Sequence, residues 1–317
     1  MPAKKIGVVG WWQGENEGDT YIKHCLEKIL GNEYSLEFIE TPFKPDRRNL
    51  WKINKLDFLI VGGGGLFTKS PPYPFSIFSQ WKKSLKTRFG FLGVGIREIG
   101  PAYRPLIEEL ANESEFFVVR DKESLELIKP FTPKAMQAPD LTFLYPRKIE
   151  RNAEREEIGV NLRIWNFEGE KQLDREKWSQ AINSLSGNKR TVPLSFKEGL
   201  DDRQAMELIQ GSKSKAFDMG LYRGIGCMVG ARLHSLIFAA QNGIPIIGIA
   251  YTPKISRFFS ELGLDEFCLG LDEYDLLEEK FQLVLERQEE ISYKLQRYSS
   301  KANAAVSKCL DGIKCKL

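Results

Sequence analysis

The sequence is poor in the residues that hold structural metal ions. Its 317 residues include only two histidines and five cysteines, and no two cysteines form a C-x-x-C pair. A Cys/His zinc site therefore has almost no ligands to use, and we expect no metal. Scattered cysteines in odd number are typical of free thiols in a reducing compartment. They are Cys25, Cys227, Cys268, Cys309 and Cys315.

The sequence also has no long apolar run and no excess of one charge. The longest apolar stretch, 243–251, has the length of a strand, whereas a membrane-spanning helix needs about 20 apolar residues. The N-terminus lacks the apolar core and cleavage site of a signal peptide. The 46 basic and 43 acidic residues give a net charge of +3, too balanced for nucleic-acid binding. We therefore expect a soluble, cytoplasmic protein without a nucleic-acid partner.

Strand-like and helix-like segments alternate along the chain, which predicts parallel, doubly wound sheets. In the first half, strands are expected at 5–10, 36–39, 58–61, 89–94 and 116–119, and helices at 20–30, 103–113 and 122–128. In the second half, strands are expected at 158–162, 191–194, 227–229 and 245–250, with a helix at 233–242. A long helix is expected from 273 to about 314.

Composition places the domain boundaries. The expected parts are an N-terminal α/β domain (1–146), a charged linker (147–157), a C-terminal α/β domain (158–272) and a helical segment (273–317). Two such sheets with a closing helix resemble the GT-B fold, an α/β architecture of two doubly wound parallel-sheet domains facing a cleft. Ligands of these sheets bind at the carboxyl ends of the strands, so the active site is expected in that cleft.

The densest group of polar residues lies where the 227–229 strand meets its helix. Arg232 contributes a fixed charge beside His234 and Ser235, and the helix that begins there contributes free N–H groups and a positive dipole. These features predict an anion site, which Lys254 can reach from beyond the next strand. A structural histidine is the usual alternative, but the adjacent arginine and helix start favour a functional His234.

Two segments of the N-terminal half are also expected to contact a ligand. Arg120 ends a buried strand and is shaped for bidentate binding of a carboxylate or phosphate, while Asp121 caps the next helix. The glycine stretch at 62–65 lets the backbone approach a ligand, although it matches neither the Rossmann nor the Walker pattern. The expected contacts are Gly63, Gly64 and Gly65. A tight turn is the alternative interpretation.

Residues on the acceptor side are expected near the first strand. Asp19 caps the first helix, and in that position it can also orient or deprotonate a sugar hydroxyl. Asn16 lies in the same loop, and Trp12 beside it either stacks on a sugar or fills core. The basic, aromatic stretch Phe75–Arg88 is either a solvated amphipathic helix or a contact with an anionic membrane surface.

Several motifs, taken in order, resemble one family. They are N-x-G-D (16–19), GGGGLF (62–67), V-R-D-x-x-S (119–124), A-P-D (138–140) and a long block from G-x-R-L-H-S to Y-x-P-K (230–254). With this order and spacing the chain resembles the polysaccharide pyruvyl transferase family. One departure is the run Ile96, Arg97 and Glu98, where the family often has a Gly-Pro turn.

The resemblance implies an enzyme that moves the enolpyruvyl group of phosphoenolpyruvate onto a sugar as a ketal, with release of phosphate. It implies that Arg120 and His234 hold phosphoenolpyruvate with Arg232 nearby, and that no metal or organic cofactor is required. We expect Ser235 and Lys254 to complete the donor site and His234 to act as general acid. The implied acceptor is a sugar of an exopolysaccharide or cell-wall glycan, often lipid-linked. Peripheral contact with the inner face of the membrane and a homo-oligomer are both compatible with it.

Two other functions stay open. A GT-B glycosyltransferase or nucleotide-sugar enzyme would share the fold, but such enzymes typically place a ribose-binding glutamate where this chain has Phe238. A phenyl ring accepts no hydrogen bond from a ribose hydroxyl. A non-catalytic polysaccharide-assembly protein would keep the fold without the chemistry, and Arg120, Arg232 and His234 together argue against it. The sequence leaves open the acceptor sugar and the position of the ketal.

Overall fold

The structure is a computed structural model that describes residues 3–13, 15–40, 47–67, 84–145, 156–164 and 171–317. The chain divides into two compact units. The first comprises 1–14, 19–145 and 302–317, and the second comprises 15–18 and 146–301. The expected linker, 147–157, lies largely outside the described residues, and its last residue, Glu157, already begins a strand.

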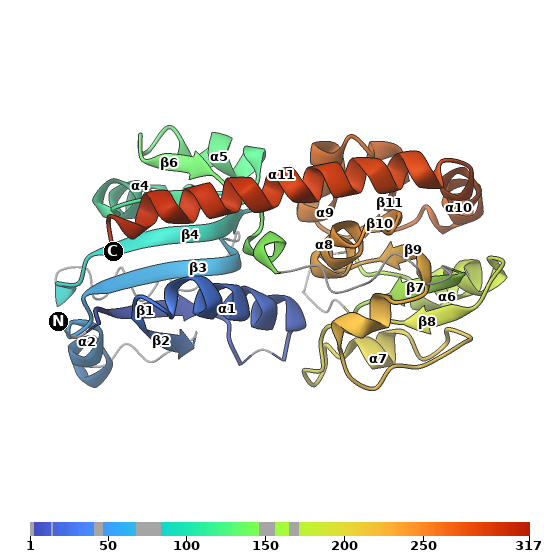
Figure 1. Ribbon diagram of the computed structural model, residues 1–317, viewed down its shortest axis with the longest axis horizontal. Coiled ribbons are helices and arrows are strands. Elements are labelled where there is room, and N and C mark those ends of the chain that lie inside the picture. Colours follow the sequence, from blue (N-terminus) through green and yellow to red (C-terminus); the bar gives the residue numbers. More distant parts are fainter. Residues whose placement is uncertain (1–2, 14, 41–46, 68–83, 146–155, 165–170) are drawn as a thin grey trace. The chain divides into compact units, whose positions relative to one another are not determined.

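The first unit is built on a six-stranded parallel sheet in the order β2-β1-β3-β4-β5-β6 (Figure 1). Its strands are β1 (Lys5–Gly10), β2 (Ser35–Glu40), β3 (Phe58–Phe67), β4 (Phe89–Ile96), β5 (Phe117–Val119) and β6 (Ala135–Gln137). Strands of such sheets are covered on both faces and therefore have nearly continuous apolar sequences. All eight residues of β4 are buried, as this rule requires.

Helices cover both faces of this sheet. They are α1 (Glu17–Leu30), α2 (Arg47–Ile53), α4 (Arg104–Glu113), α5 (Lys122–Ile128) and the 3-10 turn η2 (Leu141–Leu144). One core joins Ile22 of α1 to the C-terminal residues Val306 and Leu310. The other core contains Ile107 of α4 and Ile128 of α5. Two separate cores on opposite faces are what a doubly wound sheet requires.

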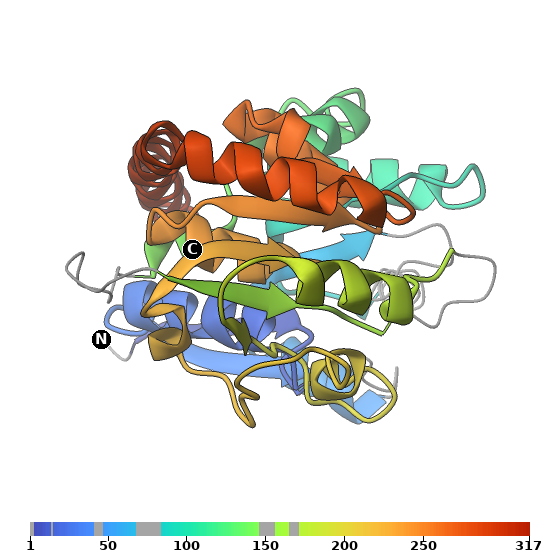
Figure 2. The same ribbon diagram turned by 90° about the vertical axis from the view of Figure 1, so that its right-hand side faces the viewer.

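The second unit holds a five-stranded parallel sheet in the order β11-β10-β9-β7-β8, with helices on both sides (Figure 2). Its strands are β7 (Glu157–Asn161), β8 (Lys189–Thr191), β9 (Ile225–Gly230), β10 (Ile246–Ala250) and β11 (Cys268–Gly270). Its helices are α6 (Arg175–Ser184), α7 (Asp202–Ala205), α8 (Leu233–Gln241), α9 (Pro253–Leu262) and α10 (Leu277–Glu286), with 3-10 turns at Met219–Tyr222, Asp265–Phe267 and Tyr274–Leu276. The expected fold of two parallel α/β sheets with a long C-terminal helix is confirmed.

The C-terminal region differs in detail from the single helix that was expected. It consists of α10 and the 27-residue helix α11 (Gln288–Lys314), which are separated at Arg287. The part of α11 before residue 302 belongs to the second unit, where Ser299 Oγ donates to Ala240 O at 3.3 Å. The part from residue 302 belongs to the first unit, where Asn303 Nδ2 donates to Phe143 O at 2.9 Å.

The glycine stretch lies inside a strand and is not a turn at the end of one. Strand β3 continues to Phe67, and its pairing with β4 shifts register between Gly64 and Phe67. Gly63 and Gly64 have φ values of +83° and +94°, which side chains other than glycine rarely adopt. The alternative interpretation of a tight turn was therefore wrong, because the glycines form an irregularity within the strand pairing.

The cap of the first helix was also assigned to the wrong residue. Helix α1 begins at Glu17, so Asp19 lies within its first turn. The Gly18 N–H donates to Asn16 Oδ1 at 3.1 Å, which places Asn16 in the capping role. For α5 the expectation is confirmed, because the Asp121 side chain accepts from Ser124 N–H at 2.8 Å.

Candidate active site

The carboxyl edge of the second sheet collects polar side chains from neighbouring strands. Arg163 follows β7, Ser195 follows β8, Arg232 follows β9 and Tyr251 follows β10. Strand β8 pairs with one edge of β7, and the next strand in the chain, β9, pairs with the opposite edge of β7. Ligands of open α/β sheets bind at the carboxyl end of such a switch point. Arg163 and Arg232 extend from the two strands that flank it.

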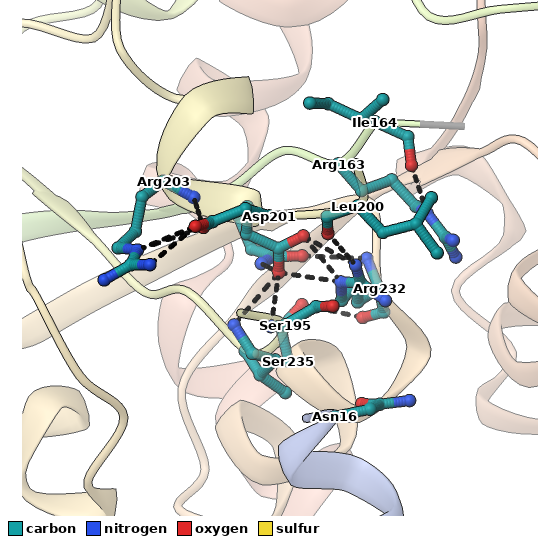
Figure 3. Close-up of polar contacts among 12 residues, drawn as sticks. Asn16, Arg163, Ile164, Ser195, Leu200, Asp201, Arg203, Arg232 and Ser235 are labelled. Atoms are coloured by element: carbon teal, nitrogen blue, oxygen red, sulfur yellow. Dashed lines mark hydrogen bonds and ion pairs between the residues drawn. The ribbon is translucent and has the colours of Figure 1, made fainter. Parts of the chain in front are cut away.

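Arg232 is held by a carboxylate that the sequence did not reveal. Its Nε lies 2.8 and 2.7 Å from the two carboxylate oxygens of Asp202, and its Nη2 lies 2.7 Å from Oδ1 (Figure 3). Arg232 is 8% exposed and Asp202 is 0% exposed. A planar guanidinium that is paired in this way has one orientation. The pair therefore fixes the cation at the start of α8.

Asp202 is itself held by a network of hydrogen bonds. Its Oδ2 accepts from the backbone N–H groups of Leu194 (2.9 Å) and Ser195 (3.1 Å), and from Asn161 Nδ2 (3.1 Å). Asn161 Oδ1 in turn accepts from the Arg232 N–H at 3.0 Å. A buried polar network that is fully satisfied is rigid. Neither Asp202 nor Asn161 was predicted from the sequence.

His234 lies in the first turn of α8 and is confined by two neighbours. A Cβ built at Gly18 would lie 1.8 Å from His234 Nδ1, so any larger residue at position 18 would displace the ring. On the other side, Phe238 is stacked with the imidazole at 6.0 Å between ring centroids and 27° between planes. Phe238 is 0% exposed, so the residue at the ribose-contact position is part of the core.

The segment that carries Gly18 is fastened to the loop after β8. The Glu17 N–H donates to Leu194 O at 2.8 Å, and the Phe196 N–H donates to Glu15 O at 3.0 Å. Asn16 forms an antiparallel bridge with Ser195. Asn16, which was expected on the acceptor side, therefore lies in the second unit, two positions before Gly18.

Ser235 has a local structural contact. Its buried hydroxyl donates to Arg232 O at 2.7 Å and closes the first turn of α8. Its expected contact with the donor stays a prediction. Lys254 lies in the first turn of α9, with its Nζ 5.3 Å from the Tyr251 ring centroid.

Tyr251 is surrounded by cations. Arg163 Nη1 donates to its hydroxyl, and the Arg163 guanidinium lies 4.4 Å from its ring centroid. Burial alone would raise the pKa of Tyr251, but Lys254, Arg163 and then Arg232 outweigh it and lower that pKa to about 8. Burial also lowers the pKa of Arg163, to about 10, so Arg163 is a cation at neutral pH.

The cluster in the second unit gathers positive charge. Arg163, Arg232 and Lys254 contribute three cations, and Asp202 pairs with one of them, Arg232. Arg163 is 6% exposed, so its charge is poorly solvated. Buried cations of this kind are stabilised by an anionic ligand. The anion site expected around Arg232 and His234 stays a prediction, and Arg163 and Tyr251 are among the groups that interact with Arg232.

The first unit holds Arg120 in a different environment. Arg120 is 8% exposed, and a Cβ at Gly95 would lie 2.8 Å from its Nε and Nη2. Its Nη1 lies 3.5 Å from Asp140 Oδ2, and its Nε lies 4.0 Å from Asp121 Oδ2. Two buried carboxylates thus hold this guanidinium, and the missing side chain of Gly95 makes room for it. The Asp140 contact was not predicted.

The other residues expected in this unit lie along the glycine stretch. A Cβ at Gly64 would lie 3.4 Å from Asp19 Oδ1, and a Cβ at Gly65 would lie 4.0 Å from Arg120 Nη2. Asp19 and Arg120 therefore lie near adjacent glycines of β3. The site roles of Asp19, Gly64 and Gly65 stay predictions.

The ring of Trp12 packs against the sheet. A Cβ at Gly63 would lie 3.3 Å from it, and its edge contacts Phe38 at 5.3 Å between centroids. Its Nε1 donates to Val8 O at 2.9 Å. These contacts agree with the core-filling alternative for Trp12. Stacking of Trp12 on a sugar stays a prediction, as does a ligand contact of Gly63.

No group of three or more His, Cys, Asp or Glu residues in the described part of the chain could hold a metal ion. No helix among the described residues is both long enough and apolar enough to cross a membrane. Most of the basic stretch Phe75–Arg88 lies outside the described residues, so its expected helix or membrane contact is not described.

The two sheets and the long C-terminal helix define the chain as a GT-B-like α/β protein, and its second unit has a cationic site. The chain belongs to the polysaccharide pyruvyl transferase family, whose model matches residues 16–253. This family places it among transferases that act on glycans. No curated protein matches the chain.

Solved structures share its fold at low sequence identity. A glycosyltransferase from Rickettsia africae is 13% identical with a TM-score of 0.59, covering 96% of this chain and 94% of its own. A UDP-GlcNAc 2-epimerase from Methanocaldococcus jannaschii is 10% identical with a TM-score of 0.54, covering 89% and 92%. A glycotransferase of kitacinnamycin is 9% identical with a TM-score of 0.56, covering both chains completely. These likenesses establish the fold alone.

Proposed function

We propose that this chain transfers the enolpyruvyl group of phosphoenolpyruvate to a glycan, where it forms a pyruvate ketal with release of phosphate. The observation that carries the proposal is the group of three cations at the β7–β9 switch point, namely Arg163, Arg232 and Lys254, of which Arg232 is held in place by Asp202. Phosphoenolpyruvate carries a carboxylate and a phosphate, so it needs several cations of fixed position. Membership of the pyruvyl transferase family supports the same donor.

The reaction needs an acid near the methylene carbon of the donor. A proton is added to C3, and the resulting positive charge at C2 is attacked by a sugar hydroxyl, which loses its own proton. The C2–O bond to phosphate then breaks, and a second hydroxyl of the sugar closes the ketal. We assign the first proton to His234, because Gly18 and Phe238 confine its ring two residues from Arg232. When the first hydroxyl attacks C2, His234 takes the proton of that hydroxyl and is restored.

The remaining roles follow from charge and position. Arg232 and Lys254 bind the donor in the second unit, and Ser235 supports the turn that presents Arg232. In the first unit Arg120 is the donor ligand that the family resemblance implies, and Asp19 is proposed to orient a sugar hydroxyl. Neither a metal nor an organic cofactor is part of the proposal. The proposed acceptor is an exopolysaccharide or cell-wall glycan, in soluble or lipid-linked form, and the proposed location is the cytoplasm or the inner face of the membrane.

Phosphate release from phosphoenolpyruvate tests the proposal. The assay uses a panel of aryl hexosides and aryl N-acetylhexosaminides as acceptors, each of which offers two hydroxyls, and it follows phosphate and the ketal product together. We expect release that depends on an acceptor and falls by about 10²–10⁴-fold in His234→Ala. The matched control is His24→Ala, since His24 is the other histidine of the chain and lies exposed on α1. Full activity of His234→Ala would contradict the proposed mechanism.

A further inference from the structure

We propose that Tyr251 is a second acid–base residue of this reaction, which gives its phenolic proton to the phosphate as the C2–O bond breaks. The inference rests on the proposed function and adds a step to it. It starts from a feature that the donor-site residues do not explain, namely a tyrosine hydroxyl between two cations at the carboxyl end of β10.

The stoichiometry of ketal formation requires two proton transfers. Two sugar hydroxyls each lose one proton, while C3 of the donor gains one proton and the departing phosphate gains the other. His234 carries out the first of these transfers, since it gives a proton to C3 and takes one from the first hydroxyl. We assign the second transfer to another group, which protonates the leaving oxygen and then takes the proton of the second hydroxyl. With Tyr251 in this role, the phenol gives its proton, becomes phenolate and is restored, so no external acid or base is consumed.

The hydrogen bonds of Tyr251 fit a proton donor. Its oxygen accepts from Arg163 and also interacts with the Lys254 side chain. Guanidinium and ammonium groups only donate, so neither cation accepts the phenolic proton. That proton is therefore available only to an acceptor other than these two, such as a phosphate oxygen. Both cations would stabilise the phenolate that forms when the proton leaves.

The charges around Tyr251 also set its acidity. The groups that act on it are Lys254 from α9, Arg163 from the segment after β7 and Arg232 from the start of α8. The carboxylate of Asp202 is already paired with Arg232. A pKa lowered to about 8 leaves the tyrosine mainly protonated at neutral pH but close to the range in which it transfers protons well. An ordinary tyrosine, with a pKa near 10, is a weaker acid by about two orders of magnitude.

The experiment compares Tyr251→Phe with Tyr274→Phe. Tyr274 also accepts a lysine hydrogen bond, from Lys177 at 3.0 Å, and its ring packs against Trp178 of α6. The first readout is a titration of tyrosinate ultraviolet absorbance in the unliganded protein. We expect the unmodified chain to show one tyrosine that ionises at about pH 8, and we expect Tyr251→Phe alone to lose it. This readout requires no substrate.

The second readout is the pH profile of kcat/KM for phosphoenolpyruvate in acceptor-dependent phosphate release, with kcat measured beside it. We expect kcat/KM of the unmodified chain to fall above about pH 8, because Tyr251 that is ionised in the free protein has no proton to give. Tyr251→Phe should lower kcat by about 10²–10⁴-fold and remove this alkaline limb of kcat/KM, while Tyr274→Phe changes neither. Thermal unfolding of each variant verifies that it is folded. A role in binding alone would raise KM and leave kcat unchanged.

The outcomes separate the two proposals. If the unmodified chain releases phosphate but Tyr251→Phe keeps its kcat and pH profile, the acid–base role of Tyr251 is overturned and the transferase stands. If no tyrosine ionises near pH 8, the role is overturned without reference to activity. If the tyrosine ionises as expected but the chain never uses phosphoenolpyruvate, the proposed function fails, and the role assigned here fails with it.

Discussion

The two carboxylate oxygens of Asp202 share the Nε and Nη2 of Arg232, at 2.7 to 2.8 Å, although the residues lie 30 positions apart in the chain. This buried pair places a positive charge at the point where β9 passes into α8. The carboxylate therefore positions the arginine that the donor-site proposal uses.

Asp202→Asn should destabilise the protein strongly. Asparagine has nearly the same shape but leaves the guanidinium of Arg232 buried without its counter-charge, and breaking a buried pair costs about 3–5 kcal/mol. Urea or thermal unfolding measures the effect. The matched control is Asp272→Asn, since the Asp272–Lys171 pair is exposed and should contribute little. Equal losses in the two variants would contradict the structural role of Asp202.

Gly18→Ala should lower activity more than stability. Alanine favours the helix by about 1 kcal/mol over glycine, but its Cβ would meet His234 Nδ1 at 1.8 Å and displace the ring. A misplacement of about 1 Å can cost about 10²-fold in rate. The control is Gly312→Ala on α11, where an added Cβ meets nothing within 4 Å. An active Gly18→Ala would show that the position of His234 does not matter.

The sequence predicted most of the fold because its main signals are local. The apolar runs that became β1 and β4 have the composition of buried parallel strands, and Asp121 stands three residues before the amide that it caps. The glycine run gave no such signal. Its positive φ values and shifted register within β3 follow from pairing with β4, and pairing is a property of the sheet.

The residues missed at the site are those that only the strand order brings together. Asp202 lies in a polar stretch typical of a loop, and nothing nearby marks it as the partner of Arg232. Arg163 did have a signal, because an arginine follows the end of a strand at four places in the described chain, at 97, 120, 163 and 232. Only Arg120 and Arg232 were predicted as site residues from it.

Arg120→Lys should weaken binding of phosphoenolpyruvate while leaving the fold intact. Lysine keeps the positive charge that neutralises Asp121 and Asp140. It lacks the planar guanidinium, which can donate two parallel hydrogen bonds to a carboxylate or phosphate. We expect KM for phosphoenolpyruvate to rise by on the order of 10-fold, about 1.4 kcal/mol. The control is Arg48→Lys on the exposed surface of α2. An unchanged KM in Arg120→Lys and in Arg120→Ala would contradict a donor-binding role for Arg120, whereas the absence of turnover with any donor would favour the non-catalytic alternative.

Stability should depend on pH through Tyr251. Its pKa is lowered to about 8 in the folded state and is near 10 in the unfolded chain. Between these pH values the unfolded state holds the proton that the folded state has lost. The ionisation of Tyr251 therefore raises the free energy of unfolding as pH rises from about 8 to about 10, and this contribution disappears as pH falls back through about 8. The gain is at most roughly 2.7 kcal/mol. Unfolding of the unmodified chain and of Tyr251→Phe across this window measures it, and a constant difference between them would contradict the lowered pKa.

The central claim is that the cationic edge of the second sheet binds phosphoenolpyruvate and does not bind a nucleotide sugar. The most direct test compares the thermal unfolding temperature of the unmodified chain in the presence of phosphoenolpyruvate, of inorganic phosphate and of UDP-N-acetylglucosamine. A ligand that binds the folded state raises this temperature, by an amount equivalent to about 2.7 kcal/mol at 100 times its Kd. The account predicts a clear rise with phosphoenolpyruvate, a smaller rise with phosphate and none with the UDP-sugar. A rise with the UDP-sugar and none with phosphoenolpyruvate would contradict it.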